Sequence, residues 1–443
     1  MPLNDTHDPR LRSWVASANE PGADFPMQNL PFGVFRRSTS SPSRIGVAIG
    51  TDIVDLQMGV ERGLFDDAPA LLRNACRASS LNELMRLGPH AWADLRSTLS
   101  GWLRTDQGGH NVHQRATESL LVAQSAVVMR LPAVVGDYTD FYASVFHATN
   151  VGSMFRPDEP LLPNYKHLPI GYHGRSSSLM PSGTSVRRPV GQMKPDGASE
   201  PIVAASGRLD YELEVGAFIG PGNALGEVIR IAEAEQHVFG VCLLNDWSAR
   251  DIQAWEYQPL GPFLAKSFAT SISPWVVTME ALEPFRSPAS PRPEADPPPL
   301  SYLSSDRDRA RGAIDLRLEV ALSTSGMRAA NEPPHVVSRS NLRHLYWTIA
   351  QMVTHHASNG CNLRPGDLLG TGTVSGPTRE SRGCLLELTW RGSEPLVLPG
   401  GETRRFLEDG DEVILRGWCE REGATRIGLG ECRGTITPAR NPA

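Results

Sequence analysis

The pattern of apolar and polar positions changes near residue 130, and the two parts predict different structures. Arg44–Leu56 alternates apolar and polar residues around a Gly-Thr-Asp turn, which predicts a β-hairpin. Residues 68–126 carry apolar residues at helical spacing, as in LNELMRL and WADLRSTLSGWL, and predict mostly helix. From Leu131 onward, short apolar runs separated by Gly- and Pro-containing loops predict strands. We therefore expect two domains, residues 1–130 and 131–443, in a mostly β (α+β) protein.

Within the second part, individual runs predict particular elements. Strands are expected where short runs are rich in β-branched and other apolar residues, namely Arg208–Gly220, His237–Asp246, Ser273–Met279 and Ile314–Thr324. Clean alternation in the last of these predicts a half-buried strand. Asn341–Ser358 has an apolar stripe at helical spacing and predicts a helix that ends at Asn359-Gly360. LLELTW, EVILRGWC and RIGLGECRGTITP predict further strands, and the Pro-rich stretch Pro284–Leu300 predicts an exposed loop.

Composition narrows the class of protein. The formal net charge of −6 lacks the basic surplus of a nucleic-acid-binding protein. No apolar run reaches the roughly 18–20 residues of a membrane span, and the N-terminus has no secretory apolar run. Six cysteines occur without any C-x-x-C pair, which argues against a zinc ribbon or a disulfide framework. We expect a cytoplasmic protein with neither a nucleic-acid nor a membrane partner.

Carboxylates are the first candidate chemistry. Glu212 and Glu214 are separated by one residue, so on a strand both side chains project to the same face. Asp246 ends the apolar run VFGVCLLN, and Asp140 follows LPAVV in the same way. If the four converge, they form an oxygen-rich cage that suits Mg²⁺ or Ca²⁺ better than zinc. A solvated strand face remains the alternative for the two glutamates, because spacing alone does not show convergence.

Two further clusters could carry chemistry. Asp246, Arg250, Gln253 and Tyr257 are spaced 4, 3 and 4 residues apart, which places them on one stripe of a short helix that Pro259 would end. A solvent-facing helix surface explains that stripe equally well. His147 is followed by small polar residues, and the alternative there is a structural histidine. The loop Gly370–Gly376 lacks the G-x-G-x-x-G spacing of a dinucleotide loop and predicts a tight turn.

Longer motifs carry a family resemblance. The runs FPMQNLPFGVF, DYTDFY, HATNVG, RLDYELEVGAFIGPGN and NDWSARDIQ resemble the fumarylacetoacetase family, and the similarity extends over almost the whole chain. The resemblance implies an N-terminal SH3-like β-barrel domain, a C-terminal catalytic β-roll domain and a homodimer. It also implies hydrolysis of the carbon–carbon bond of 4-fumarylacetoacetate, a small dianionic diketo acid, to fumarate and acetoacetate. This reaction is the last step of tyrosine and phenylalanine breakdown.

The resemblance also implies a role for each matched position. The matches to ligands of a divalent metal, Mg²⁺ or Ca²⁺, are Asp140, Glu212, Glu214 and Asp246, completed by Lys266 and Thr270. His147 matches the general base, oriented by Glu387, and the oxyanion is assigned to Arg250, Gln253 and Lys266. Substrate contacts are assigned to Tyr142, Arg156, Tyr172, Gln253, Tyr257 and Thr373.

These assignments match the demands of the reaction. Water needs a base at neutral pH, and a carbon leaving group needs its developing charge stabilised. Two other readings stay open at this point. One is a sibling activity on the same metal site, such as an acylpyruvate hydrolase, a decarboxylase or an isomerase. The other is a non-catalytic binding protein on an enzyme fold.

Overall fold

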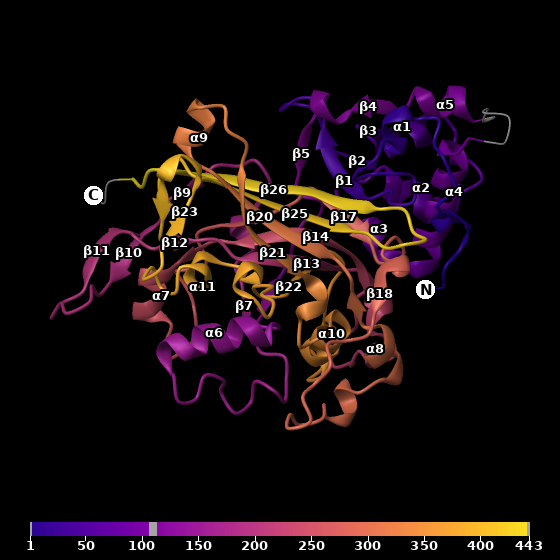
Figure 1. Ribbon diagram of the computed structural model, residues 1–443. Coiled ribbons are helices and arrows are strands. Elements are labelled where there is room, and N and C mark those ends of the chain that lie inside the picture. The colour runs from indigo at the N-terminus through magenta and orange to yellow at the C-terminus, as the bar shows by residue number, and fades with distance from the viewer. Residues whose placement is uncertain (1, 106–112, 441–443) are drawn as a thin grey trace.

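A computed structural model describes residues 2–105 and 113–440 of the chain. Within these residues the fold is mixed α+β, with more residues in strands than in α-helices. Figure 1 shows the N-terminal region in indigo and purple at the upper right, against the edge of a large body of sheets and short helices. The expectation of a mainly β protein is therefore confirmed at this level.

Strands and helices of the N-terminal region follow the predicted order. Its strands are β1 (Phe32–Arg36), β2 (Arg44–Ile49), β3 (Asp52–Asp55), β4 (Leu121–Ala123) and β5 (Val128–Arg130). Its helices are α1 (Leu56–Glu61), α2 (Ala70–Cys76), α3 (Asn82–Arg86), α4 (Pro89–Leu103) and α5 (Gln114–Glu118). The predicted hairpin is confirmed, because β2 and β3 pair antiparallel.

The expected SH3-like barrel is not confirmed. In the described residues, β4 pairs only with β3 and β5 pairs only with β1, so the sheet stays open at both ends. β1 also pairs with β17 (Trp275–Thr278) of the larger region. Because β1 extends into the larger sheet, the N-terminal strands form one arm of that sheet rather than a closed barrel.

The larger sheet positions the candidate site residues. Its path runs β4-β3-β2-β1-β17-β14-β13-β22-β6-β7. The strands of the second region in it are β6 (Tyr138–Phe141), β7 (Gly171–His173), β8 (Leu179–Pro181), β13 (Leu213–Ile219), β14 (Val238–Asp246), β16 (Thr270–Ile272), β17 and β22 (Leu368–Gly370). Antiparallel pairing of β13 with β14 and parallel pairing of β22 with β6 bring segments far apart in sequence next to one another.

A second sheet crosses the molecule beside the first, and its long yellow strands stand out in Figure 1. It comprises β21 (His335–Asn341), β20 (Arg317–Ser323), β25 (Glu412–Cys419), β26 (Ile427–Thr437) and β9 (Val186–Arg187). The half-buried strand predicted at Ile314–Thr324 is instead covered on both faces. Glu319, on its polar side, is buried beneath Arg339 and Arg416 of the neighbouring strands.

The remaining elements are short. Two-stranded pairs join β10 (Val190–Met193) to β11 (Ile202–Ala205), β12 (Leu209–Asp210) to β15 (Ser248–Ala249), β18 (Arg286–Ser287) to β19 (Ala313–Ile314), and β23 (Leu396–Val397) to β24 (Thr403–Arg404). The helices are α6 (Val145–Phe155), α7 (Arg250–Glu256), α8 (Asp306–Arg311), α9 (Ser325–Ala329), α10 (Ile349–Ala357) and α11 (Leu385–Leu388). Among the described residues, no helix is both long and apolar enough to cross a membrane.

Two predicted elements are wrong in type or length. The helix expected over Asn341–Ser358 begins only at Ile349, where Thr348 accepts a hydrogen bond from the Gln351 amide. Asn341 instead ends β21, where it pairs with Arg317. LLELTW, expected as a strand, contains helix α11. Tertiary contacts override the local pattern in both places.

Two large hydrophobic clusters make up most of the core. One lies between the two sheets and the helices of the second region, and includes Trp247, Trp347 and Phe285. The other joins the N-terminal region to one face of the large sheet, where Trp92 of α4 packs against Phe239 of β14. The N-terminal helices therefore cover the back of the strands that carry the candidate carboxylates.

Candidate active site

Four acidic side chains converge where neighbouring strands of the large sheet end. Asp140 lies in β6, Glu214 in β13, Asp246 at the end of β14, and Glu212 just before β13. One ligand oxygen from each lies within 4.8 Å of the others, and all four residues are buried. We call this group the carboxylate cluster. The alternative of a solvated strand face does not hold for the two glutamates, because they are 5% and 0% exposed.

Three polar side chains donate hydrogen bonds into the carboxylate cluster. The Lys266 ammonium lies 2.6 Å from Glu212 Oε2 and 2.8 Å from Asp246 Oδ2. Thr270 Oγ1 donates to Asp246 Oδ1 at 2.7 Å, and Tyr172 Oη donates to Asp246 Oδ2 at 3.1 Å. The structure therefore brings together the six residues assigned to a metal site from the sequence.

Glycines make room for the cluster. A Cβ on Gly370 would lie 2.6 Å from Asp140 Oδ1 and 3.0 Å from Glu214 Oε2. The Gly372 amide, held at a φ of +73°, donates to both of these carboxylates at 3.2 and 3.1 Å. The loop Gly370–Gly376 is thus the tight turn that its sequence predicts, and its backbone forms one wall of the site.

Burial and like charge act together on the acidic groups. Burial, with the added charge of Asp246, raises the pKa of Asp140 to about 8. Burial followed by the charges of Asp140 and Asp246 raises the pKa of Glu214 well above its ordinary value. Burial also acts on Glu212, but the charges of Lys266 and Arg250 outweigh it and lower the pKa of Glu212. One lysine therefore compensates only part of the negative charge.

The donor set fits a hard divalent cation. All the acidic ligands are oxygens, which Mg²⁺ and Ca²⁺ prefer. Glu214 Oε1 is buried and accepts no hydrogen bond in the described part of the chain, so a coordination position is available on it. A buried carboxylate oxygen without a partner is costly unless a cation or donor satisfies it.

A second constellation pairs His147 with Glu387. His147 lies in the first turn of α6, where the Ser144 side chain caps the helix by accepting from the His147 amide. Its Nδ1 lies 2.6 Å from Glu387 Oε2, and both side chains are buried. Burial acts on Glu387, but the charge and hydrogen bond of His147 outweigh it and lower the pKa of Glu387 to about 2. The imidazole is also close enough to Glu212 for its charge to contribute to the lowered pKa there.

Sequence reasoning missed three residues that hold Glu387. Asn150 Nδ2 donates to Oε1 at 2.8 Å, while Ser375 Oγ and Cys384 Sγ donate to Oε2 at 2.7 and 3.3 Å. Asn150 follows His147 by three residues and so lies on the same side of α6, which was the available signal. Cys384 precedes Glu387 by only three residues, but the strand expected at LLELTW hid this neighbour, and no local pattern connects Ser375 with the carboxylate.

Arg250 and Gln253 lie beside the carboxylate cluster. Arg250 Nη1 lies 2.7 Å from Glu212 Oε1 and donates to Gln253 Oε1 at 3.1 Å, as expected for residues one turn apart on α7. Arg250 Nη2 is buried without a partner among the described residues. The predicted helical stripe is wrong for Asp246, which ends β14, and Tyr257 follows the last residue of the helix.

The proposed substrate contacts are only partly assembled. The Tyr142 ring lies edge-on to the His147 imidazole with centroids 5.1 Å apart, and Thr373 Oγ1 is buried without a partner in the described residues. Tyr257 is 37% exposed. Arg156 is exposed at the end of α6, and its guanidinium donates to the Pro160 carbonyl rather than into the cluster.

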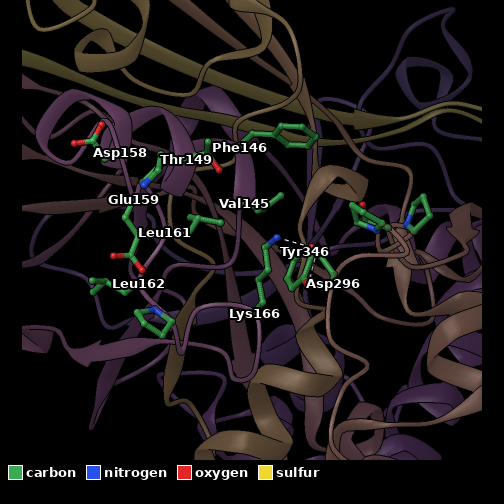
Figure 2. Close-up of a pocket in the computed structure, with 15 residues that line it drawn as sticks. Val145, Phe146, Thr149, Asp158, Glu159, Leu161, Leu162, Lys166, Asp296 and Tyr346 are labelled. Carbon is green, nitrogen blue, oxygen red and sulfur yellow. Dashed lines mark hydrogen bonds and ion pairs between the residues drawn. The ribbon is translucent and has the colours of Figure 1, made fainter.

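A separate cavity of about 660 Å³ lies on the other side of α6. Val145, Phe146 and Thr149 of α6 line it, as Figure 2 shows, whereas His147 and Asn150 of the same helix contact Glu387. Lys166, ion-paired with Asp296, also lines it. None of the residues assigned to the site from the sequence lines this cavity. Its far wall is the predicted Pro-rich loop.

Comparison with known proteins gives a consistent result along the whole chain. Residues 28–132 match the family model described as Fumarylacetoacetase N-terminal, and residues 137–437 match the one described as Fumarylacetoacetate (FAA) hydrolase C-terminal. The chain is 50% identical over 424 residues to fumarylacetoacetase of Rattus norvegicus, covering 95% of this chain and 98% of that protein. It is 49% identical over 430 residues to fumarylacetoacetase of Arabidopsis thaliana, covering 97% and 99%.

A solved structure shares the fold at low sequence identity. Fumarylacetoacetate hydrolase from psychrophilic Exiguobacterium antarcticum is 16% identical, with a TM-score of 0.50, over 93% of this chain and 100% of that chain.

Proposed function

The chain belongs to the fumarylacetoacetase family, and from this premise we propose that it hydrolyses 4-fumarylacetoacetate to fumarate and acetoacetate. The observation that carries the proposal is a buried four-carboxylate cluster beside an imidazole held by its own carboxylate partner. Relatives about 50% identical over nearly the full chain carry the name of this activity, which favours it over a sibling decarboxylase or isomerase.

The carboxylate cluster, with Lys266 and Thr270 around it, would hold a divalent cation, Mg²⁺ or Ca²⁺. When bound, the cation would act as a Lewis acid toward the diketone oxygens of the substrate. Lys266 holds Glu212 and Asp246 in place and offsets part of the negative charge.

The proposed base is His147. With Nδ1 donating to Glu387, its Nε2 is left as the acceptor that takes a proton from water. The water oxygen adds to the ketone carbonyl of the fumaryl group, and the bond from that carbon to the neighbouring CH2 then breaks to give fumarate and the acetoacetate enolate. Proton transfer to the enolate carbon completes the balance. The Glu387 carboxylate stabilises the imidazolium formed in between, as in the hydrolytic triads.

Arg250, Gln253 and Lys266 are the proposed donors to the developing oxyanion. The support is that Arg250 Nη2 is buried without a partner in the described residues, while its Nη1 is held by Glu212 and Gln253. A preorganised donor of this kind strengthens its bond as negative charge develops in a water-excluded site.

The substrate's two carboxylates require donors of their own. Arg can bind a carboxylate through two parallel hydrogen bonds, so we assign one carboxylate to Arg156. The remaining proposed contacts are Tyr142, Tyr172, Gln253, Tyr257 and Thr373. Because Arg156 points to the Pro160 carbonyl, this role requires its side chain to turn toward the cluster when substrate binds.

We also propose a homodimer. An exposed apolar surface around α7 supports it, with Trp255, Leu260 and Phe263 exposed by 41%, 97% and 65%. Neighbouring Val203 of β11 is 60% exposed, so the surface extends onto the β10–β11 hairpin that packs against α7. Contiguous apolar surface of this kind is typical of protein–protein contacts.

The division into residues 1–130 and 131–443, with a β-roll in the second, stays a proposal. The family models meet between residues 132 and 137, which supports the boundary. All six cysteines are unpaired thiols, which supports a reducing, cytoplasmic location.

A direct assay tests the proposed reaction. Purified protein with Mg²⁺ or Ca²⁺ is mixed with fumarylacetoacetate, and loss of the diketone ultraviolet absorbance is followed while the products are identified by chromatography. We expect fumarate and acetoacetate in equal amounts. Release of carbon dioxide, or formation of an isomer without cleavage, would replace this proposal with a sibling activity.

A further inference from the structure

Asp210 connects the two halves of the candidate active site. It ends β12, two residues before Glu212, and its side chain is fully buried. Its carboxylate accepts four hydrogen bonds, from Arg250 Nε and from the amides of Tyr211, Leu385 and Leu386. We infer that Asp210 is a positioning residue that holds the oxyanion donor Arg250 and the helix bearing Glu387 in one fixed geometry. The inference rests on the proposed function for the roles of those two residues.

The hydrogen bond from Arg250 to Asp210 orients the arginine side chain. Asp210 Oδ2 lies 2.9 Å from Arg250 Nε, and Glu212 Oε1 lies 2.7 Å from Arg250 Nη1. The guanidinium is planar, so contacts on two of its nitrogens determine where the third points. That third nitrogen, Nη2, is the buried atom without a partner in the described residues. Asp210 therefore aims the one free donor of Arg250.

The hydrogen bonds from two backbone amides to Asp210 hold the start of α11. The first amides of a helix have no partner within the helix, and here the side chain of Cys384 at the cap position accepts no hydrogen bond from them. Asp210 Oδ1 accepts from the Leu385 amide at 2.8 Å and Oδ2 from the Leu386 amide at 3.0 Å. Glu387 is the next residue. The carboxylate of Asp210 thus positions the backbone from which Glu387 reaches His147.

These contacts explain why the segment LLELTW is helical although its sequence predicts a strand. The bonds that hold its first turn come from a residue about 175 positions earlier in the chain. The same carboxylate accepts hydrogen bonds from both Arg250 and the amides of α11, so these two elements cannot shift independently. Asn, the neutral side chain of the same size, cannot replace Asp210, because it has one acceptor oxygen and its amide nitrogen is a donor.

The test compares Asp210→Asn with Asp411→Asn. Asp411 is a matched control, because it is buried, pairs with Arg404 at 2.8 Å and accepts from the Glu408 amide at 2.9 Å. None of these partners belongs to the site. We expect Asp210→Asn to lower kcat for fumarylacetoacetate by about 10²-fold, as for loss of one oxyanion donor, with KM nearly unchanged. Asp411→Asn should lower the thermal stability about as much as Asp210→Asn does, and leave kcat unchanged.

A double-mutant cycle with Arg250→Met separates positioning from general destabilisation. If Asp210 acts largely through Arg250, Asp210→Asn in the Arg250→Met background should cost much less than the loss it causes in the wild-type background. The inference would be overturned if the losses of kcat in the two single variants multiplied in full in the double variant. It would also be overturned if Asp411→Asn lost as much kcat as Asp210→Asn. Asp210→Glu, which keeps the charge but lengthens the side chain, serves as the second variant if Asp210→Asn does not fold, and the same loss is expected.

A crystal structure of the Asp210 variant decides the question without any assay. We expect the Arg250 guanidinium and residues 385–387 to move together, with residues 404–411 in place. If both stay where they are, the inference fails even when the enzyme hydrolyses fumarylacetoacetate. If the wild-type enzyme does not hydrolyse fumarylacetoacetate, the proposed function fails, and the same crystal structure still supports or rejects the positioning role.

Discussion

The carboxylate cluster and the His147–Glu387 pair are both buried, but their charges are handled in opposite ways. In the cluster, four acidic residues from three strands and an adjoining segment are balanced only by Lys266 and, at Glu212, by Arg250, and one oxygen of Glu214 has no partner in the described residues. In the pair, Glu387 accepts hydrogen bonds from Asn150, Ser375 and His147. The pair is complete with the side chains of the chain itself, whereas the cluster has a surplus of negative charge that a cation would neutralise.

Removal of divalent metal should separate the two regions most strongly. We expect exhaustive dialysis against EDTA to abolish turnover of fumarylacetoacetate, because the cluster, and not the His147–Glu387 pair, is proposed to hold a cation. Added Mg²⁺ or Ca²⁺ should restore activity in the ultraviolet assay. Full activity after exhaustive chelation would contradict the metal-assisted mechanism.

Loss of His147, the proposed base, should leave the carboxylate cluster intact. His147→Ala is expected to lower kcat by roughly 10²–10⁴, the usual contribution of a general base, with KM little changed. His355→Ala is a matched control, because His355 pairs with Tyr302 outside the site. Steady-state kinetics measure both variants, and unchanged turnover in His147→Ala would remove that residue from the mechanism.

The two regions should respond to pH in opposite directions in the chelated protein. The pKa of Asp140 is raised from 3.8 to about 8, so the folded state keeps a proton that the unfolded state loses. This contribution is fully present below the ordinary pKa and is lost as pH rises toward 8, by at most about 1.4 kcal/mol per pH unit. The pKa of Glu387 is lowered from 4.5 to about 2, so its contribution is lost only as pH falls through that range.

Urea unfolding in EDTA between pH 4.5 and 8 measures how the free energy of unfolding depends on pH. Stability should fall as pH rises, and Asp140→Asn should flatten the dependence. Saturating Mg²⁺ or Ca²⁺ should also flatten it. A stability that rises with pH over this range in EDTA would show that the cluster does not hold its protons.

Single amide substitutions should give effects of opposite sign in the two regions. Glu214→Gln removes a buried carboxylate whose pKa is raised, and should stabilise the chelated protein by about 1–3 kcal/mol while weakening metal binding. Glu387→Gln replaces one acceptor oxygen with an NH2 donor that faces at least one of the four donors around Glu387, and should destabilise the protein by a similar amount. Thermal unfolding in EDTA compares them, and a loss of stability in both would contradict the difference.

The smallest expected effect concerns the far oxygen of Glu387. Asn150→Ala removes the donor to Oε1 and leaves the bonds to Oε2 in place. We expect kcat to fall about tenfold, equivalent to about 1.4 kcal/mol in the barrier. Thr149→Ala, on the opposite side of α6 at the separate cavity, is the control and should leave kcat unchanged.

The sequence predicts the residue types of the site better than their geometry. Glu212 and Glu214 share a face because of their spacing, and Asp140 and Asp246 each follow an apolar run. Their convergence depends on the strand order β14-β13-β22-β6, which brings Gly370 between Asp140 and Glu214. That order results from pairing between segments far apart in the chain, and no local pattern encodes it.

Local patterns also failed where distant contacts decide the structure. The segment LLELTW is helical because Asp210 binds its first amides. Asn341 ends a strand rather than beginning a helix, because it pairs with Arg317 across the sheet. Asn150 was missed for the same reason, since only the fold brings the Glu387 carboxylate to it, whereas Cys384 was missed because its segment was expected to be a strand.

The hydrophobic cluster shared by the N-terminal region and the large sheet has a consequence for inherited variation. Trp92 of α4 packs on Phe239 of β14, the strand that ends at Asp246. A substitution that loosens this contact would weaken the support of Asp246, a proposed metal ligand, without touching the site. In a cell, such variants would lower the amount of folded enzyme rather than its catalytic constants. Buried residues of the N-terminal helices that pack on this sheet, such as Trp92, should therefore tolerate substitution poorly.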